Sequence, residues 1–459
     1  MAKADDLQKA RSLIEANRPG EAWPIIERYL LDDPEDPQAI IVAGFLNVRV
    51  RNFPLAYLYA RRLSELIPRD PAAWINMVQA CKFMQREKEG ERAAKQGLSV
   101  AKLPNDRAAL YQNLASIYMD AGRFDEAEPM LMKALEIEPD DPKFLANLGM
   151  CQLARHDWVN GWKNYRHLIG TEERVRQIYN DPEEPLWEGA PGQTVLLYGD
   201  QGIGDEVCFA SMVNDAAARC DKLILNVDRR LARLFKRSFP GVDVYGLRDQ
   251  RWDPGIRIDA SLPMSQAGEY LRLSEDEFPS EPYLKADADR VLMWRSLFAT
   301  KRKPIIGIGW TGGLWHTGSK FRQCTLDALL PLFQSVDAHW VSLQYKDSQT
   351  EIDAFRAKHP EIDLVQYPHA TLTQDYDDIA SLVAALDLVV SVPTAVVHLA
   401  GALGTPCYAM QSPKPCWKFA KGLAFHPNVE IVDSFGSWDQ TIRETTAHVK
   451  GFFCEKAAA

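Results

Sequence analysis

A period of about 34 residues runs through the first third of this 459-residue chain and constrains its fold more than any other feature. Small residues recur with this period: Ala22, Ala56, Gly90, Ala127 and Gly161. Prolines recur at nearly the same spacing: Pro34, Pro68, Pro104 and Pro139. Each is expected to end the second helix of a pair. A small residue lets two helices approach closely, so the period predicts stacked helix pairs that form an all-α solenoid.

The clearest copy of this period carries nearly every diagnostic position of a known repeat: Tyr111, Leu114, Ala115, Tyr118, Gly122, Ala127, Leu131, Ala134 and Pro139. Weaker copies lie before and after it, and residues 1–170 therefore resemble about five tetratricopeptide repeats. Solenoids present an extended concave surface, so the resemblance implies a protein client bound in the repeat groove. The alternative is that the array only packs against the rest of the chain.

Composition narrows the class of protein. The net charge of −10 argues against a nucleic-acid binder, since no excess of Lys and Arg exists to meet phosphates. The eight cysteines form no CxxC pair and no secretory signal begins the chain, which favours reduced thiols, no metal site and a cytoplasmic location. The longest apolar run, residues 379–402, is interrupted by Asp387, Pro393 and His398, so we expect no membrane span.

The pattern changes after a segment rich in proline and glycine, residues 171–192, which we interpret as a linker. Short apolar runs then alternate with helical patterns, at residues 194–198, 222–227, 242–245, 256–260, 305–310, 339–343, 363–366, 388–392 and 406–410. This alternation predicts two Rossmann-like α/β domains, residues 193–300 and 301–459. Ligands of such sheets bind outside the carboxyl ends of the strands, so the expected site is a cleft between the two halves.

The first half contains a glycine loop directly after its first strand, Gly199-Asp-Gln-Gly-Ile-Gly-Asp205. Gly202 and Gly204 allow close approach to the backbone, and Asp205 lies where a helix is expected to begin. The motif alone is a weak signal, and an ordinary strand-to-helix turn remains the alternative.

Two loops of the second half suit a phosphate or diphosphate. The first is rich in glycine, includes Gly312, and ends in the cations Lys320 and Arg322. The second places Thr394 at the start of a helix whose free N–H groups favour an anion, and His398 lies one turn further on the same face. A flexible surface loop and a structural histidine are the corresponding alternatives.

Together these loops and the segment Ser381–Gly404 resemble the glycosyltransferases of the heptosyltransferase type. More closely, the chain resembles bacterial proteins that fuse tetratricopeptide repeats to such a domain, some of which glycosylate flagellin. The resemblance implies a GT-B-like fold, a nucleotide-sugar donor bound mainly by the second half, and no metal or other cofactor.

Carried over by position, the resemblance makes Asp205 the general base, with Gly202 and Gly204 in the acceptor-side loop. The resemblance also implies that the donor phosphates are bound by Gly312, Lys320, Arg322, Thr394 and His398. Pro393 stands where heptosyltransferases commonly have an acidic residue that holds the sugar, which makes an ADP-heptose donor less expected.

The function these features predict is transfer of a sugar from a nucleotide-sugar donor to a protein Ser or Thr hydroxyl, with the repeats recruiting the acceptor, flagellin among the candidates. Two alternatives stay open. One is a non-catalytic scaffold with a degenerate transferase domain, and the other is a transferase acting on a lipopolysaccharide-type glycan.

Overall fold

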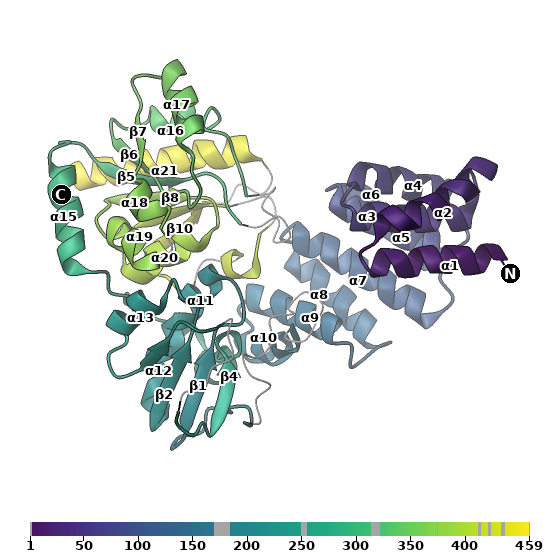
Figure 1. Cartoon of the computed structure of the whole chain (residues 1–459), viewed down its shortest axis with the longest axis horizontal. Helices are drawn as coiled ribbons and strands as arrows, with labels where there is room; N and C mark the ends of the chain where they lie inside the picture. The colour runs from purple at the N-terminus through teal and green to yellow at the C-terminus, as the bar shows by residue number, and fades with distance from the viewer. Residues whose placement is uncertain are drawn as a thin grey trace. The chain divides into compact units, whose positions relative to one another are not determined.

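The computed structural model describes residues 2–168, 184–248, 255–313, 322–373, 375–411, 415–420, 424–432 and 437–458. The chain divides into two compact units, Met1–Cys151 and Gln152–Ala459 (Figure 1). Among the described residues, no helix is both long and apolar enough to pass through a bilayer.

The first unit is built from consecutive helices: α1 (Ala2–Glu15), α2 (Pro19–Asp32), α3 (Pro37–Arg49), α4 (Phe53–Leu66), α5 (Pro71–Phe83), α6 (Glu87–Val100), α7 (Pro104–Asp120), α8 (Phe124–Leu135) and α9 (Pro142–Ala154). The small residues lie where helices approach, as predicted. Ala22 and Ala127 are fully buried, and a Cβ on Gly90 would meet the side chain of Ile117 at 2.4 Å. Pro104 corrects one expectation, because it begins α7 instead of ending α6.

Helix α10 (Trp158–Tyr165) completes the fifth helix pair with α9 but belongs to the second unit. Trp162 is 1% exposed and donates a 2.9 Å hydrogen bond to the carbonyl of Arg272. A Cβ on Gly268 would lie 2.4 Å from the Trp162 ring. The last repeat helix is therefore packed into the α/β unit through a large indole that requires a glycine opposite it.

The first sheet has the all-parallel order β3-β2-β1-β4, formed by β1 (Thr194–Tyr198), β2 (Lys222–Asn226), β3 (Asp243–Tyr245) and β4 (Ala260–Pro263). Its helices are α11 (Ile203–Phe209), α12 (Val213–Arg219), α13 (Ala232–Ser238) and α14 (Gly268–Leu271). This strand order is that of a Rossmann half, in which the chain starts in the middle and turns back after three strands.

The second sheet is also parallel and has the order β10-β9-β8-β5-β6-β7. Its strands are β5 (Ile305–Gly309), β6 (His339–Ser342), β7 (Asp363–Gln366), β8 (Leu388–Ser391), β9 (Cys407–Met410) and β10 (Val429–Val432). Counted from β5, this is the complete six-strand Rossmann order. Two such sheets in succession confirm the predicted fold, a helical repeat array followed by a GT-B-like pair of α/β domains.

The helices of the second half are α15 (Ala288–Ala299), α16 (Leu330–Phe333), α17 (Gln349–Lys358), α18 (Pro368–Thr371), α19 (Tyr376–Val383), α20 (Ala395–Leu403) and α21 (Trp438–Ala458). The C-terminal helix α21, yellow in Figure 1, packs on α16, β9 and β10. Its Ile442 and Val449 join the core that Ile306, Ile308 and Val390 form between sheet and helices.

Two strands differ from the sequence prediction. The apolar run 256–260 enters the sheet only at its last residue, since β4 begins at Ala260, opposite Val195 of β1. Ile256 is 39% exposed and precedes the strand. Strand β10 was not predicted, because a four-residue edge strand that carries the exposed Glu430 gives no clear apolar pattern.

Candidate functional site

The second sheet reverses its strand order between β5 and β8, and the loops that follow these two strands lie against each other. Gly309 pairs with Ser391, and a Cβ on Gly309 would lie 2.5 Å from the Ser391 hydroxyl. A Cβ on Gly312 would lie 2.0 Å from the methyl group of Thr394. Glycine at these positions lets the loop after β5 reach the start of α20, the crevice where doubly wound sheets bind ligands.

Two features that favour an anion meet at the start of α20. Thr394 caps the helix by accepting a 3.3 Å hydrogen bond from the N–H of Val396. Arg322 donates to the carbonyl of Pro393 at 3.3 Å, which holds its guanidinium beside the same turn. Burial lowers the pKa of Arg322, against the opposing attraction of Cys416 and Asp205. Lys320, the other predicted cation, lies outside the described residues.

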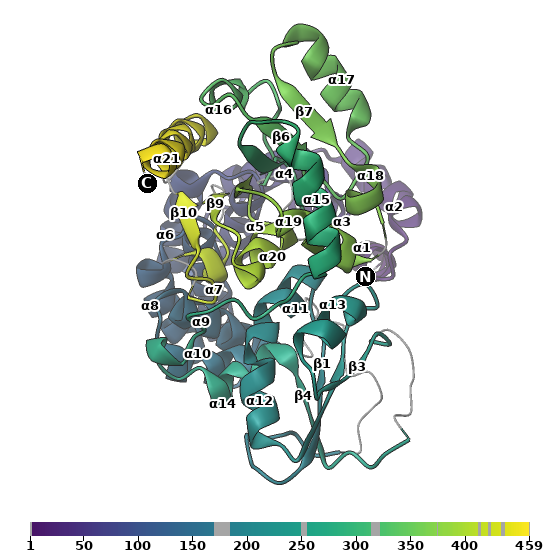
Figure 2. The same cartoon turned by 90° about the vertical axis from the view of Figure 1, so that its left-hand side faces the viewer.

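The glycine loop of the first half lies opposite this turn. Helices α11 and α20 pack together, and Figures 1 and 2 both show them side by side. A Cβ on Gly204 would lie 3.0 Å from the Cα of Ala395 and 3.2 Å from its Cβ. The first residues of the two helices are thus in contact. Asp205 of the first half therefore lies next to the turn of the second half that contains Pro393 and Thr394.

Asp205 makes contacts with both halves. Its Oδ2 accepts a 3.0 Å hydrogen bond from the N–H of Gly202, and its Oδ1 lies 2.8 Å from the Nζ of Lys418. Its side chain is 27% exposed, so the carboxylate is open to solvent although it is paired. Lys418 belongs to a 3₁₀ turn, Trp417–Phe419, that follows β9, and no sequence motif pointed to it.

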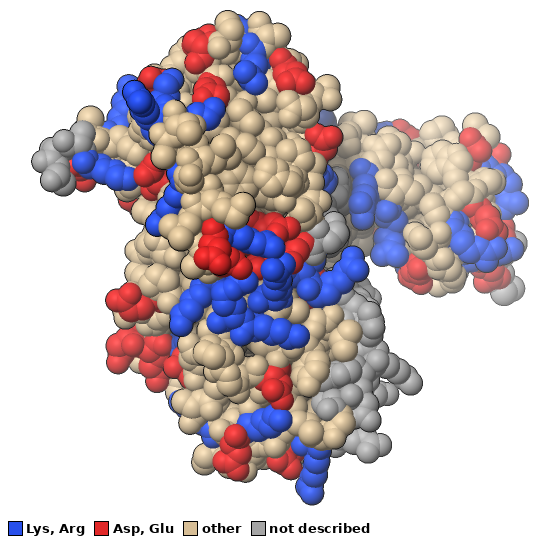
Figure 3. Space-filling model, turned by 60° about the vertical axis from the view of Figure 1, so that its left-hand side comes forward, with Lys and Arg blue, Asp and Glu red and all other residues tan. Residues whose placement is uncertain are grey.

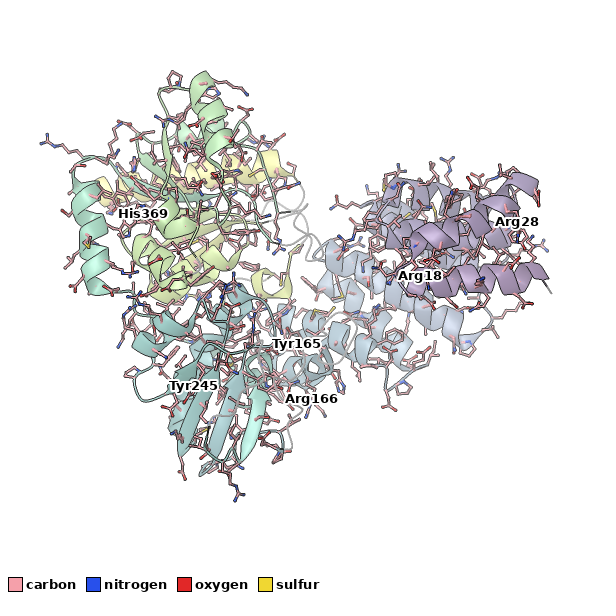
Figure 4. The ribbon with its side chains drawn as sticks, viewed as in Figure 1. Arg18, Arg28, Tyr165, Arg166, Tyr245 and His369 are labelled. Carbon is pink, nitrogen blue, oxygen red and sulfur yellow. The ribbon has the colours of Figure 1, made fainter. Side chains whose placement is uncertain are left out.

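The loop's other aspartate has a structural role. Asp200 is buried and accepts hydrogen bonds from the N–H of Ser265 at 3.2 Å and from its hydroxyl at 2.7 Å. It thereby joins the loop to the turn after β4. The neighbouring Gln201 donates a 2.9 Å hydrogen bond to the hydroxyl of Tyr165, the last residue of α10. Tyr165 and the following Arg166 are labelled in Figure 4.

A buried ionic network contacts the glycine loop on its protein side. Glu206 is 1% exposed, forms an ion pair with Arg248, and accepts a 2.8 Å hydrogen bond from the N–H of Asp228. Arg248 also pairs with the Asp228 carboxylate at 2.9 Å and donates to the carbonyl of Gln201 at 3.1 Å. A Cβ on Gly199 would lie 2.4 Å from the Glu206 carboxyl group, so the first glycine of the motif makes room for this network.

His398 lies inside the fold at this junction. It is 5% exposed, and its Nδ1 lies 3.1 Å from the Nε2 of His426. Burial, with the nearby Lys418, lowers the pKa of His398 to about 3, so the ring is neutral at physiological pH. The structure brings His398 within the same junction as Thr394 and Asp205, and its contact with a donor stays a prediction.

One group of described residues has the side-chain types and spacing of a metal site. Ligand atoms of Cys208, His398 and His426 all lie within 4.8 Å of one another, and all three side chains are buried. Burial raises the pKa of the Cys208 thiol, the two rings are hydrogen-bonded to each other, and the cation Lys418 is an electrostatic neighbour of both Cys208 and His398. A neutral packed cluster accounts for these contacts without an ion.

Ion pairs between α13 and α19 connect the two halves near the junction of α11 and α20. Arg237 of α13 pairs with Asp377 of α19, which is fully buried, across the two halves, whereas Arg290 of α15 pairs with Asp378 within the second half. Arg233 lies 3.3 Å from Asp377 as well. Figure 3 shows a band of Lys and Arg side chains beside a group of Asp and Glu side chains on one face. No sequence motif indicated the contact of Asp377 across the halves.

The fold and the junction define a class of protein: a tetratricopeptide array joined to two Rossmann-like domains that meet at the carboxyl ends of their strands. Residues 108–141 match the family model of the tetratricopeptide repeat, which confirms the repeats predicted from the sequence.

Known proteins similar to the chain include Protein FlbA of Caulobacter vibrioides (strain ATCC 19089 / CIP 103742 / CB 15). The two are 28% identical over an alignment of 383 residues, with 76% of this chain and 63% of FlbA covered. The chain therefore spans less than two thirds of the length of this curated relative.

Solved structures resemble parts of the chain. Escherichia coli ADP-heptose lipopolysaccharide heptosyltransferase II is 14% identical, with 57% of this chain and 99% of that chain covered and a TM-score of 0.42. TTC0263, a tetratricopeptide protein of Thermus thermophilus, is 22% identical, with 38% and 93% covered and a TM-score of 0.31. Likeness at these scores establishes no shared activity.

Proposed function

We propose that this protein is a glycosyltransferase that moves a sugar from a nucleotide-sugar donor to a Ser or Thr hydroxyl of a protein. The observation that carries the proposal is the contact between the starts of α11 and α20. It brings a partly exposed carboxylate, Asp205, beside a turn that gathers Arg322 and the N-terminus of α20. A base and an anion site on facing domains are what transfer from a phosphate-activated sugar needs.

The donor side supports a diphosphate. The dipole at the start of the nine-residue helix α20 favours negative charge, and Arg322 adds a planar cation at the same turn. Both would stabilise the negative charge that develops on the departing nucleotide phosphate. Lys320, two residues before Arg322 in the chain, is a further candidate for this role.

The acceptor side supplies the base. The hydroxyl oxygen of the acceptor attacks the anomeric carbon, and its proton passes to the carboxylate of Asp205. The bond between the anomeric carbon and the phosphate oxygen breaks, and its electron pair leaves with the nucleotide phosphate. The chain's own residues thus account for both ends of the displacement.

The repeats suggest that the acceptor is a protein. A solenoid of helix pairs offers an extended surface suited to a polypeptide, and it has no evident use for a small sugar acceptor. Flagellin is among the candidate clients, on the resemblance of the whole chain to repeat-bearing flagellin transferases.

A binding screen followed by a transfer assay tests the proposal. One of UDP, GDP, ADP or CMP, or a sugar conjugate of it, should raise the melting temperature, and a ligand at 100 times its dissociation constant adds about 2.7 kcal/mol of stability. Arg322→Ala should weaken that shift, whereas Arg356→Ala on the exposed side of α17 should leave it unchanged. Mass spectrometry of client proteins incubated with the bound donor should then find the sugar on Ser or Thr.

Three different results would each contradict a different part of the proposal. Absence of any nucleotide-dependent stabilisation would remove the transferase assignment. Binding without turnover would favour the scaffold alternative, which Pro393 and the pairing of Asp205 with Lys418 make worth testing. Transfer to a lipopolysaccharide-type glycan in place of protein would refute the protein acceptor.

A further inference from the structure

Lys418 is a buried lysine that forms an ion pair with Asp205. It is 5% exposed, and its Nζ lies 2.8 Å from Asp205 Oδ1. The two residues are 213 positions apart and belong to different halves of the second unit. Burial alone lowers the pKa of Lys418, but the attraction of Asp205 outweighs it and the pKa lies above its usual value.

The surroundings of Lys418 fix its ammonium group in place. The Nζ lies 5.0 Å from the centre of the Phe209 ring and 4.8 Å from that of Trp417, within reach of cation–π attraction. Gln411 donates a 2.7 Å hydrogen bond to the carbonyl of Phe419, which holds the turn that carries the lysine. A buried cation is costly unless it is paired, so this arrangement depends on an ionised Asp205.

We propose that Lys418 is a positioning residue for the transfer reaction, holding the Asp205 carboxylate in its ionised form and aimed at the junction of the two halves. This inference rests on the proposed function, since Asp205 is the base there. Lys418 lies outside the glycine loop, the loop after β5 and the start of α20, in the turn Trp417–Phe419.

The contacts of Asp205 restrict its orientation. One oxygen accepts from the N–H of Gly202 and the other faces Lys418, so the carboxylate cannot rotate freely. A base held in one orientation reacts more readily than a mobile one, because misplacement by about 1 Å can cost about 100-fold in rate.

Among the described residues, the charged and titratable groups near Asp205 include side chains from four elements. They are Lys418 of the 3₁₀ turn, Arg322 of the loop after β5, His398 of α20 and Cys208 of its own helix α11. The pKa of His398 is about 3 and the pKa of Cys208 is raised, so both are uncharged near neutral pH. The other two groups of this set are cations, and loss of either raises the pH at which Asp205 takes up a proton.

The central test compares the pH profiles of kcat/KM for the wild type and Lys418→Met. Because an adjacent cation lowers a carboxyl pKa by about one to three units, the acid limb of the variant should move up by about one unit or more. The kcat should fall about tenfold or more while the nucleotide dissociation constant stays within about threefold. Lys418→Arg should keep the acid limb near that of the wild type.

A matched control replaces a lysine in an exposed pair. Lys456 lies 2.7 Å from Asp387 on the surface, and Lys456→Met should leave the profile unchanged. An acid limb that stays in place in Lys418→Met would overturn the proposal. So would a loss of nucleotide affinity as large as the loss of kcat, because Lys418 would then be a donor ligand.

A second measurement works without any activity, so that failure of the proposed function and failure of this inference are distinguishable. The Asp205 carboxyl carbon is followed by carbon-13 NMR in protein labelled at aspartate, and Asp205→Asn identifies its signal. The titration midpoint should be higher in Lys418→Met than in the wild type. Equal midpoints would refute the role of Lys418 even if transfer is found. If Lys418→Met does not fold, Lys418→Gln serves in the same comparison.

Discussion

At the level of single residues, sequence patterns predicted some residues of the candidate site and missed others. Loop patterns predict Asp205, Arg322 and Thr394 as site residues, and the structure places them around one junction. Lys418 was missed because it lies in no glycine loop or helix cap and its partner is 213 residues away. Contacts of that kind depend on how two domains pack, which no local pattern encodes.

The first glycine of the loop gives a prediction about stability. Gly199→Ala should lower the free energy of unfolding by about 3 kcal/mol, because its Cβ would displace the carboxylate of the buried Glu206–Arg248 pair. The matched control is Gly451→Ala in α21, where the new Cβ meets nothing within 4 Å and alanine should be neutral or stabilise by about 0.5–1 kcal/mol. Urea denaturation of both variants measures the difference. Equal effects would contradict this account of Gly199.

The buried histidines give a prediction about pH. The pKa of His398 is lowered to about 3 by burial, whereas an unfolded histidine titrates near pH 6.5. Between these values the unfolded chain binds a proton that the native chain does not, so stability falls as pH falls from about 6.5 to 4, by about 1.4 kcal/mol per pH unit. His398→Asn should reduce this slope by about 1.4 kcal/mol per pH unit, which corresponds to one proton fewer taken up on unfolding.

The matched control for this prediction is His369→Asn. Its ring is exposed and stacks on Trp294, so its replacement should leave the pH slope unchanged. Unfolding free energies at several pH values between 7 and 4 provide the measurement. A slope in His398→Asn that equals that of the wild type would show that the ring is protonated in the native state.

At the scale of elements, helix and strand placement followed from sequence patterns, while the contacts between the halves did not. The strands β1, β2 and β5 lie within the predicted runs, because a strand buried on both faces is nearly continuous in apolar residues. Acidic residues in the first turn of α19 are favoured by the helix dipole alone, so the sequence does not indicate a long-range partner for them. In the structure Asp377 is fully buried against Arg237 of α13.

The contact between α13 and α19 can be tested with Arg237→Met. Removing the arginine leaves Asp377 buried with only the longer contact to Arg233, so stability should fall by about 2 kcal/mol. Lys358→Met, which removes the exposed pair with Asp327, should cost less than about 0.5 kcal/mol. In an Asp377→Asn background the Arg237→Met change should cost less, and an unchanged cost would show that the pair itself contributes nothing.

At the scale of the whole molecule, the repeat period and the compact units divide the chain differently. The sequence predicts an array that extends to residue 170, because α10 continues the 34-residue period. In the structure α10 belongs to the second unit, where Trp162 packs on Gly268 and Tyr165 bonds to the glycine loop. A repeat pattern records how helices pair with each other and says nothing about a second surface on the last helix.

Two fragments test this division. Residues 142–459 retain α9 and α10 and should fold cooperatively, whereas residues 171–459 lack Trp162 and should be less stable by about 3–5 kcal/mol, the cost of emptying a buried tryptophan site. Circular dichroism and thermal unfolding compare them. Equal stability of the two fragments would show that α10 is dispensable for the α/β unit.

The central claim is that the junction of α11 and α20 performs sugar transfer with Asp205 as its base. The most direct measurement is nucleotide release from the bound nucleotide sugar by the full chain and by Asp205→Asn, with donor affinity measured on the same samples. We expect the variant to bind the donor within a few fold of the wild type while its turnover falls about 100-fold or more. Turnover by Asp205→Asn close to that of the wild type would contradict it.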